Sequence, residues 1–161
     1  MKLAILVLED EPPVRAALAR DLEPFAPWVR IEYAEDVADA REVVEEITAD
    51  GDELALILAD HRLPGESGVD FLVASRQVAA TGDARRVLVT GQADQADTIR
   101  AINDGGLDHY IAKPWQAAEL ADTVRTQLTN YVVSTGTDPL VALPVLQADR
   151  VVDLLRSRPD R

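Results

Sequence analysis

Four acidic side chains stand directly after two short apolar runs, and they are the residues of this sequence best suited to chemistry. Glu9–Glu11 follow the run Leu3–Leu8, and Asp60 follows the run Leu54–Ala59. Apolar runs of this length without alternation are typical of strands covered on both faces, as in a parallel sheet. The carboxyl ends of such strands share one edge, where ligands bind. We therefore expect these acids to lie together at that edge.

Polar residues of other types end two more of the predicted strands. Thr90 ends the run Arg86–Thr90, and Lys113 follows the segment Asp108–Ala112. Carboxylates that crowd together repel one another unless a cation joins them, and a set of oxygen ligands favours a hard ion such as Mg²⁺. A hydroxyl and an ammonium group in the same place could hold an incoming anion. The combination predicts a phosphoryl-transfer site in which Asp60 is the nucleophile.

The elements that would position these residues alternate along the chain between strands and helices. The predicted strands cover residues 3–8, 30–34, 54–60, 86–90 and 108–112. A helical pattern follows each strand, beginning in turn at Pro12, Asp36, Ser67, Asp94 and Trp115. This alternation implies right-handed crossovers and an α/β fold, with a parallel sheet covered by helices on both faces.

A change in composition at residues 134–139 sets off a tail from this alternating unit. We expect one domain over residues 1–131 and a tail of loop plus short helix over residues 132–161. The tail has an apolar stripe at helical spacing, formed by Ala148, Val151, Val152 and Leu155. A helix of about a dozen residues is marginal alone in water, so it should dock on its own domain or on a second copy, and we favour a homodimer. The alternative is a frayed terminus.

Composition excludes several kinds of function. The chain has no cysteine, which rules out disulfides, a thiol nucleophile and thiolate metal sites. Its net charge of −13 argues against direct binding to nucleic acid, which needs basic surface. No apolar run approaches the length of a membrane span, and no signal peptide follows Met1. We expect a cytoplasmic protein without membrane contact.

Four motifs in order make this chain resemble the response-regulator receiver domain of two-component signalling. Leu6–Pro12 is similar to the acidic motif of the first strand, and Asp60–Gly65, with Gly68 beyond it, is similar to the phosphoacceptor motif. Leu88–Gly91 and Tyr110–Pro114 are similar to the remaining two. The resemblance covers residues 1–131. It implies a flavodoxin-like, doubly wound sheet of five strands in the order 2-1-3-4-5.

The resemblance also implies a phosphoacceptor and a metal site. Asp60 would accept a phosphoryl group from a sensor histidine kinase or from a phosphotransfer protein of a phosphorelay. Asp10 and Asp60 would bind Mg²⁺ directly. Glu9, which replaces a common Asp, would act through a water molecule, and the backbone carbonyl of Arg62 would be a further ligand.

Further roles follow from the same resemblance. Thr90 would bind the phosphoryl oxygens and Lys113 would pair with them, while Thr90 and Tyr110 would form the conformational switch. Arg62 and Gln92 should border the path of a hydrolytic water, and we expect them to tune the dephosphorylation rate. Output would use the face made by residues 94–103, 108–112 and the helix after Trp115, toward a downstream protein target.

Other functions share some of these features. Aspartyl-phosphate phosphatases generally carry a second Asp two residues after the nucleophile, and Arg62 occupies that position here. A flavodoxin-like cofactor binder would need a loop that cradles phosphate after the first strand, where Glu9–Glu11 would repel it. We therefore expect a signalling domain rather than a turnover enzyme. Alternatively, the chain is the receiver portion of a larger protein whose output domain, FAD-dependent reductase-like or a cyclic-di-GMP phosphodiesterase, is absent from these residues.

Overall fold

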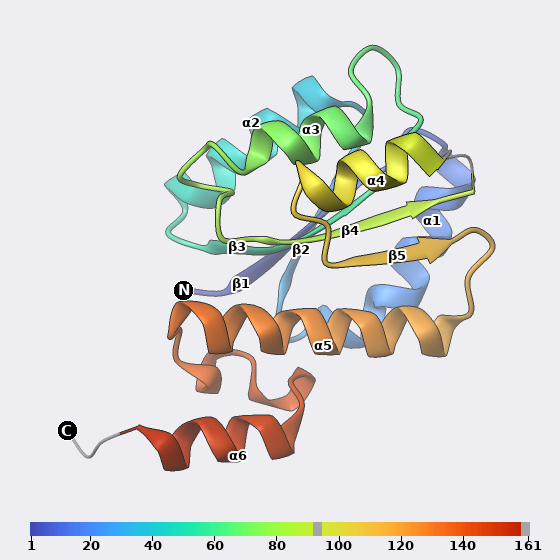
Figure 1. The fold of residues 1–161 in the computed structure, drawn as a ribbon. Helices are drawn as coiled ribbons and strands as arrows, with labels where there is room; N and C mark the ends of the chain where they lie inside the picture. The colour runs from blue at the N-terminus through green and yellow to red at the C-terminus, as the bar shows by residue number, and fades with distance from the viewer. Residues whose placement is uncertain (92–94, 159–161) are drawn as a thin grey trace.

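The computed structural model describes residues 1–91 and 95–158 and contains one five-stranded parallel sheet (Figure 1). The strands are β1 (Leu3–Leu8), β2 (Arg30–Ala34), β3 (Glu53–Ala59), β4 (Arg85–Thr90) and β5 (His109–Ala112). Their order is β2-β1-β3-β4-β5, and each neighbouring pair is parallel. The predicted flavodoxin-like α/β fold with strand order 2-1-3-4-5 is confirmed.

Helices cover both faces of this sheet (Figure 1). Those in the strand connections are α1 (Pro12–Leu22), α2 (Val37–Ala49), α3 (Gly68–Ser75) and α4 (Gln95–Asn103), with the short 3-10 turn η1 (Glu23–Phe25) after α1. The long helix α5 (Ala117–Thr135) follows β5. The helices α1 and α5 lie on one face of the sheet, and α2, α3 and α4 lie on the other.

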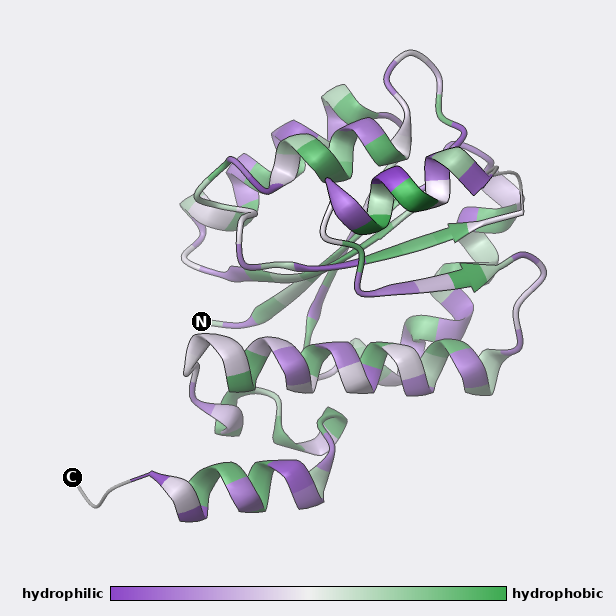
Figure 2. Cartoon of the chain, viewed as in Figure 1, coloured by the Kyte–Doolittle hydropathy of each residue, from purple (hydrophilic) through white to green (hydrophobic). Residues whose placement is uncertain are grey.

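The central strands are buried on both faces, which explains why their sequences are apolar without alternation. Every residue of β1 is buried. Leu3, Ile5 and Val7 join the hydrophobic cluster under α1 and α5, whereas their neighbours join the cluster under α2 and α3. Figure 2 shows the hydrophobic character of β1 and β4. Successive side chains of a strand point to opposite faces, so a strand between two helical layers needs apolar residues at every position.

Local signals place the starts of two helices. The side chain of Asp36 accepts a hydrogen bond from the backbone N–H of Asp39 at the start of α2. Ser67 does the same for the N–H of Asp70 at the start of α3. Such N-terminal caps satisfy backbone donors that have no partner inside the helix, so polar residues at these positions begin helices.

The helix α5 continues past residue 131, where we expected the domain to end. It runs to Thr135 and stops at Gly136, which has a left-handed φ of 74°. Val132 is fully buried in the cluster under α1 and α5, so packing extends the helix beyond the predicted boundary. The loop thus starts later than predicted because Val132 is packed in the core and because Gly136 can adopt the left-handed conformation that ends the helix.

The tail folds back on its own domain. It contains the 3-10 turns η2 (Pro139–Val141) and η3 (Leu143–Val145) and the helix α6 (Ala148–Ser157). Ala142, Val145, Leu146 and Val151 are buried in the same cluster as α1 and α5. Docking on the domain itself, one of the two options that the apolar stripe left open, is therefore what the structure shows.

The apolar stripe expected along α6 is divided in the structure. Val151 is buried, whereas Ala148, Val152 and Leu155 are exposed. Leu154, which lay outside the expected stripe, packs against the cluster instead. The docked side of α6 is thus rotated from the expected one.

The helices that the structure describes include none with both the length and the apolar character needed to cross a bilayer.

Candidate functional site

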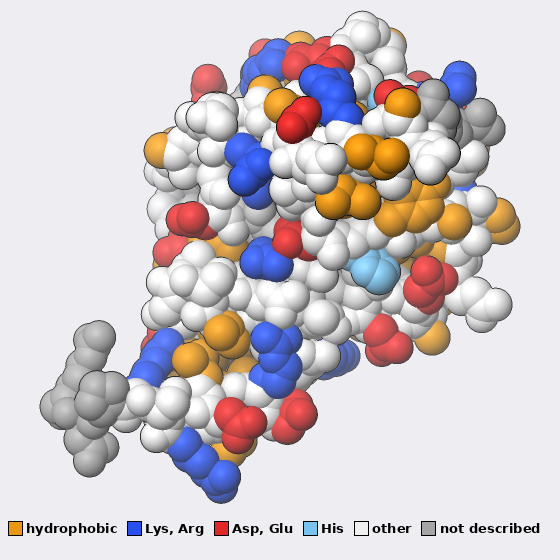
Figure 3. All heavy atoms as spheres, in the orientation of Figure 1, with side chains coloured by type: hydrophobic (Ala, Val, Ile, Leu, Met, Phe, Trp, Pro, Cys, Tyr) orange, Lys and Arg blue, Asp and Glu red, His pale blue; other side chains and the backbone are white. Residues whose placement is uncertain are grey.

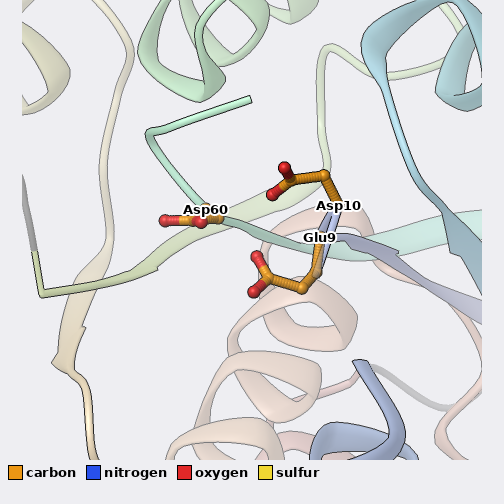
Figure 4. Close-up of side chains that lie close together, drawn as sticks. All are labelled: Glu9, Asp10 and Asp60. Carbon is orange, nitrogen blue, oxygen red and sulfur yellow. The ribbon is translucent and has the colours of Figure 1, made fainter. Parts of the chain in front are cut away.

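Three carboxylates meet at the carboxyl edge of the sheet, as Figure 4 shows. Glu9 and Asp10 follow β1, Asp60 follows β3, and each offers an oxygen within 4.8 Å of the others. The strand register explains this proximity. Leu8 pairs with Ala59, and the N–H of Asp60 donates to the carbonyl of Leu8 at 2.9 Å, so the next residues along the two strands lie side by side. Three of the four acids expected at this edge therefore cluster, whereas Glu11 is exposed and is not part of the group.

These carboxylates have unused hydrogen-bonding capacity. Among the described residues, buried oxygens without a hydrogen-bond partner include one from each acid, namely Oε2 of Glu9, Oδ1 of Asp10 and Oδ1 of Asp60. A buried polar atom left without a partner is costly, and adjacent carboxylates also repel one another. A hard divalent cation such as Mg²⁺ takes oxygen ligands and would relieve both costs. The donor set therefore fits the expected metal.

One ammonium group compensates part of this negative charge. Nζ of Lys113, just after β5, lies 2.8 Å from Oε1 of Glu9 and 3.2 Å from Oδ2 of Asp60. Burial opposes the charged form of Lys113, but the hydrogen bond to Glu9 and the charge of Asp60 raise its pKa above the ordinary value. Lysine is thus held charged against two acids that come from different strands.

Glu9 has the most perturbed acidity of the cluster. Its side chain is 1% exposed. Burial raises the pKa of Glu9 to about 7, Lys113 acts against this rise, and the neighbouring Asp60 adds to it. Buried carboxyl groups with a raised pKa inside a cluster of charges are common at functional sites.

Thr90 and Tyr110 lie on the next two strands. Thr90, the last residue of β4, is fully buried. The hydroxyl of Tyr110, on β5, donates to the backbone carbonyl of Thr90 at 2.9 Å. This bond links the residue expected to touch a phosphoryl group with the residue expected to switch.

Four of the predicted site residues open on one cavity of about 520 Å³, and Glu9, Asp10 and Tyr110 are not among its lining residues. Asp60, Arg62, Thr90 and Lys113 all line it. Its other lining residues come from the start of α1 and from the loops after β4 and β5; they are Glu11, Pro13, Val14, Ala17, Gly91, Pro114 and Trp115. Gln92, which we expected beside this cavity, lies outside the described residues. The metal-binding role expected for the Arg62 carbonyl stays a prediction.

Gly68 allows the chain to close around Asp60. The N–H of Gly68 donates to the carbonyl of His61 at 2.9 Å, which brings the start of α3 against the end of β3. A Cβ atom on Gly68 would overlap with the backbone carbonyl oxygen of Asp60. This position of the phosphoacceptor-like motif therefore needs glycine because two backbone segments approach too closely for any side chain.

Arg15 supports the acid cluster, and the sequence analysis missed it. Its Nη1 donates to the backbone carbonyl of Glu9 at 2.9 Å, with the carbonyl of Asp10 at 3.5 Å. Arg15 thus ties α1 to the loop that presents both acids. Because its acceptors are backbone atoms, no pairing of side-chain types in the sequence signals this role.

Two further contacts tie the site to distant elements. Nε2 of His61, the residue after Asp60, lies 3.0 Å from Oδ2 of Asp97 on α4. Nε1 of Trp115 donates to Oδ2 of Asp21 on α1 at 2.9 Å. Each pair joins residues far apart in sequence, so only the folded chain shows them.

The arrangement can hold an incoming phosphoryl group. Asp60 presents an unpaired carboxylate oxygen, Lys113 supplies a positive charge, and Thr90 lies on the wall of the same cavity. A carboxylate nucleophile with cationic and hydroxyl groups beside it is suited to forming an acyl phosphate.

A model of the response regulator receiver domain matches residues 5–125 of this chain. Similar curated proteins include the hydrogenase transcriptional regulatory protein HoxA of Bradyrhizobium diazoefficiens, 33% identical over 135 residues, which are 83% of this chain and 26% of that protein. The phosphate regulon transcriptional regulatory protein PhoB of Escherichia coli is 35% identical over 127 residues, 78% of this chain and 51% of PhoB. The chain thus spans about a quarter to a half of these relatives.

Solved structures show the same fold. The signal receiver domain of an HD domain-containing protein from Pseudomonas fluorescens Pf-5 has a TM-score of 0.73 at 23% identity, covering 85% of this chain and 94% of that one. A CheY-like response regulator receiver domain protein from Methanospirillum hungatei JF-1 has a TM-score of 0.69 at 21% identity, covering 81% of this chain and 97% of that one.

Proposed function

This chain belongs to the response regulator receiver domain family of two-component signalling, and on that premise we propose that it is switched by phosphorylation of Asp60. An oxygen of Asp60 attacks the phosphorus of a phosphohistidine on a sensor histidine kinase or phosphotransfer protein. The new O–P bond replaces the P–N bond, and the leaving imidazole takes up a proton. The buried, unpaired oxygens of Glu9, Asp10 and Asp60 are the observation that carries this proposal.

The acid cluster is proposed to hold Mg²⁺. Asp10 and Asp60 would bind the ion directly, Glu9 would act through a water molecule, and the backbone carbonyl of Arg62 would complete the protein ligands. When bound, Mg²⁺ would offset the negative charge of the carboxylates and of the phosphoryl oxygens. The support is the oxygen-only character of the cluster and its excess of acids over the single ammonium of Lys113.

The remaining site residues are proposed to bind the phosphoryl group and to change conformation when it is present. Lys113 would pair with one phosphoryl oxygen and Thr90 would donate a hydrogen bond to another. The bond from Tyr110 to the Thr90 carbonyl supports coupled movement of these two residues. Arg62 and Gln92 are proposed to set the lifetime of the acyl phosphate. The output surface is proposed to be the face of α4, β5 and α5.

A phosphatase function is less well supported than a receiver function. A turnover phosphatase would need a general acid at the position of Arg62.

The relatives HoxA and PhoB, named as transcriptional regulatory proteins, extend well beyond the part that this chain matches. We therefore propose that output passes to a downstream protein target or to a further domain of a larger protein, in the cytoplasm where family members act.

Acetyl phosphate with Mg²⁺ tests the proposal directly. Intact-mass spectrometry should show the gain of one phosphoryl group on the wild-type chain and none on Asp60→Asn. Asp10→Asn should slow the reaction at least tenfold, because it removes a metal ligand. Asp122→Asn, an exposed carboxylate on α5, is the matched control and should react like the wild type. Full labelling of Asp60→Asn would contradict the proposal.

A further inference from the structure

The helix α6 has two apolar sides, and the described chain covers one of them. Val151 and Leu154 pack against the cluster under α5. Ala148, Val152 and Leu155 form a second stripe at positions that share one side of a helix, and Val152 and Leu155 are 43% and 47% exposed. In Figure 1, α6 lies at the outer edge of the molecule, with the rest of the described tail and α5 on one side only. The second stripe therefore has no partner among the described elements.

The charged residues beside this stripe are acidic at the start of α6 and basic at its end. Asp149 lies in the first turn and Arg156 in the last, and both are exposed. At 100° per residue the two side chains fall on the same flank of the stripe. Figure 3 shows acidic and basic side chains next to each other over this part of the surface. One end of the flank is thus negative and the other positive.

We propose that α6 is a dimerisation element that pairs antiparallel with α6 of a second copy, with Val152 at the two-fold axis. In this register Ala148 of each copy is level with Leu155 of the other to within one residue, so a small side chain faces a large one. Asp149 of each copy is level with Arg156 of the other to within one residue and on the same side of the interface, and symmetry makes this ion pair twice. A parallel two-fold pair would carry this flank to opposite sides of the interface in the two copies, so that Asp149 would not meet Arg156 of the other copy; the ion pairs therefore favour the antiparallel arrangement.

The second copy is the occupant because the stripe is complementary to itself. An unrelated partner would have no reason to match both the small-to-large order of the apolar residues and the negative-to-positive order of the flank. Three apolar side chains per helix make an interface smaller than that of a stable dimer, even with the exposed Leu140 and Leu143 nearby in sequence. We expect a Kd on the order of 10–100 µM.

Sedimentation equilibrium on the unphosphorylated chain tests the surface. The wild type should show a monomer–dimer equilibrium, and Val152→Asp should weaken it at least tenfold. Val78→Asp, at a comparably exposed apolar residue after α3 and away from the proposed output surface, is the matched control and should leave the equilibrium unchanged. A wild type that stays monomeric up to about 0.5 mM, or a dimer lost in Val78→Asp but kept in Val152→Asp, would overturn the proposal.

Charge exchange tests the antiparallel register and does not depend on Asp60. Asp149→Arg alone and Arg156→Asp alone should each weaken self-association, because every copy then presents like charges to its twin. An equimolar mixture of the two variants should form a heterodimer at least as readily as the wild type forms its dimer, since both ion pairs are restored. A mixture that associates no better than the separate variants would contradict the register. Circular dichroism of each variant checks that the substitution at an exposed residue leaves the protein folded.

Discussion

At the scale of single residues, Glu9 is where burial and charge conflict most. Its carboxyl group is almost fully buried, one oxygen bonds to Lys113, and the other has no hydrogen-bond partner among the described residues. Burial raises the pKa of Glu9 to about 7, from an ordinary value of 4.5. Without a metal ion the folded protein therefore binds this proton more tightly than the unfolded chain. The contribution of protonated Glu9 to the free energy of unfolding is therefore fully present below about pH 4.5 and is lost as the pH rises through about 7.

The same pKa predicts that Mg²⁺ binding depends on pH. Mg²⁺ favours the ionised carboxylate, so the proton on Glu9 must leave when the ion binds. The apparent affinity for Mg²⁺ should rise roughly tenfold between pH 6 and pH 8 as one proton is released. The fluorescence of Trp115, which lines the site cavity, offers a readout for the titration.

Glu9→Gln is the control for this prediction. It keeps the shape of the side chain but has no proton to release in this range, so its weaker Mg²⁺ affinity should be nearly constant from pH 6 to pH 8. An equally steep pH dependence in Glu9→Gln would assign the titration to another group.

At the scale of elements, α4 is held to the domain chiefly by polar contacts. Ala101 is its one buried residue, whereas Ile99 and Ile102 are 48% and 54% exposed. Figure 3 shows hydrophobic side chains gathered at the surface over α4. Asp97 pairs with His61, the residue after Asp60, and Arg100 pairs with Asp70 on α3. A helix with so few buried apolar contacts should open more readily than its neighbours.

Loss of the His61 contact should loosen α4. In His61→Ala we expect amide exchange across α4 to accelerate about two- to fivefold, the effect of losing a partly exposed pair worth about 0.5–1 kcal/mol. Exchange in β1 and β3 should not change, because their hydrogen bonds lie in the centre of the sheet. Hydrogen–deuterium exchange by mass spectrometry resolves these segments.

Arg41→Met provides the comparison for His61→Ala. It removes a pair that does not involve α4, Arg41 with Glu66, in which the Arg41 side chain is more exposed than that of His61, 57% against 14%. Exchange across α4 should stay at the wild-type rate in this variant. Equal acceleration in both variants would show general loosening of the domain rather than a link between His61 and α4.

At the scale of the whole molecule, the tail completes the core on one face of the sheet. Leu146 is 3% exposed and belongs to the cluster that includes Leu128 and Val132 of α5. The hydroxyl of Thr137 donates to Glu53 at 3.0 Å, and Tyr131 donates to the same carboxylate oxygen at 2.9 Å. Apolar packing and shared polar contacts thus make the tail part of the folded domain.

Leu146→Ala should therefore lower the free energy of unfolding by about 2–4 kcal/mol, as large-to-small changes in a packed core do. Leu140→Ala, at a tail leucine that is 65% exposed, should change it by less than about 0.5 kcal/mol. Urea denaturation followed by circular dichroism measures both. Equal, small effects would show that the tail does not pack on the domain in solution.

The sequence by itself determined the sheet and the acid cluster. Apolar runs without alternation identify strands covered on both faces, and parallel strands bring their carboxyl ends to one edge. Those two rules place Glu9, Asp10 and Asp60 together before any coordinates are known. The strand order came from the resemblance of four motifs to a family, because alternation alone is compatible with several orders.

Only the tertiary structure decided the contacts that depend on how helices are rotated and which backbone atoms they reach. Arg15 bonds to carbonyl groups, which every residue has, so its sequence position does not reveal the partner. His61 and Asp97 meet because the fold brings α4 against the loop after β3, and their types are ordinary for surface residues. In α6 the spacing grouped Val151 with Val152, but packing against α5 buried the first and left the second exposed. Periodicity defines an apolar side to within a wide arc, and the shape of the neighbouring surface selects the part of that arc that is buried.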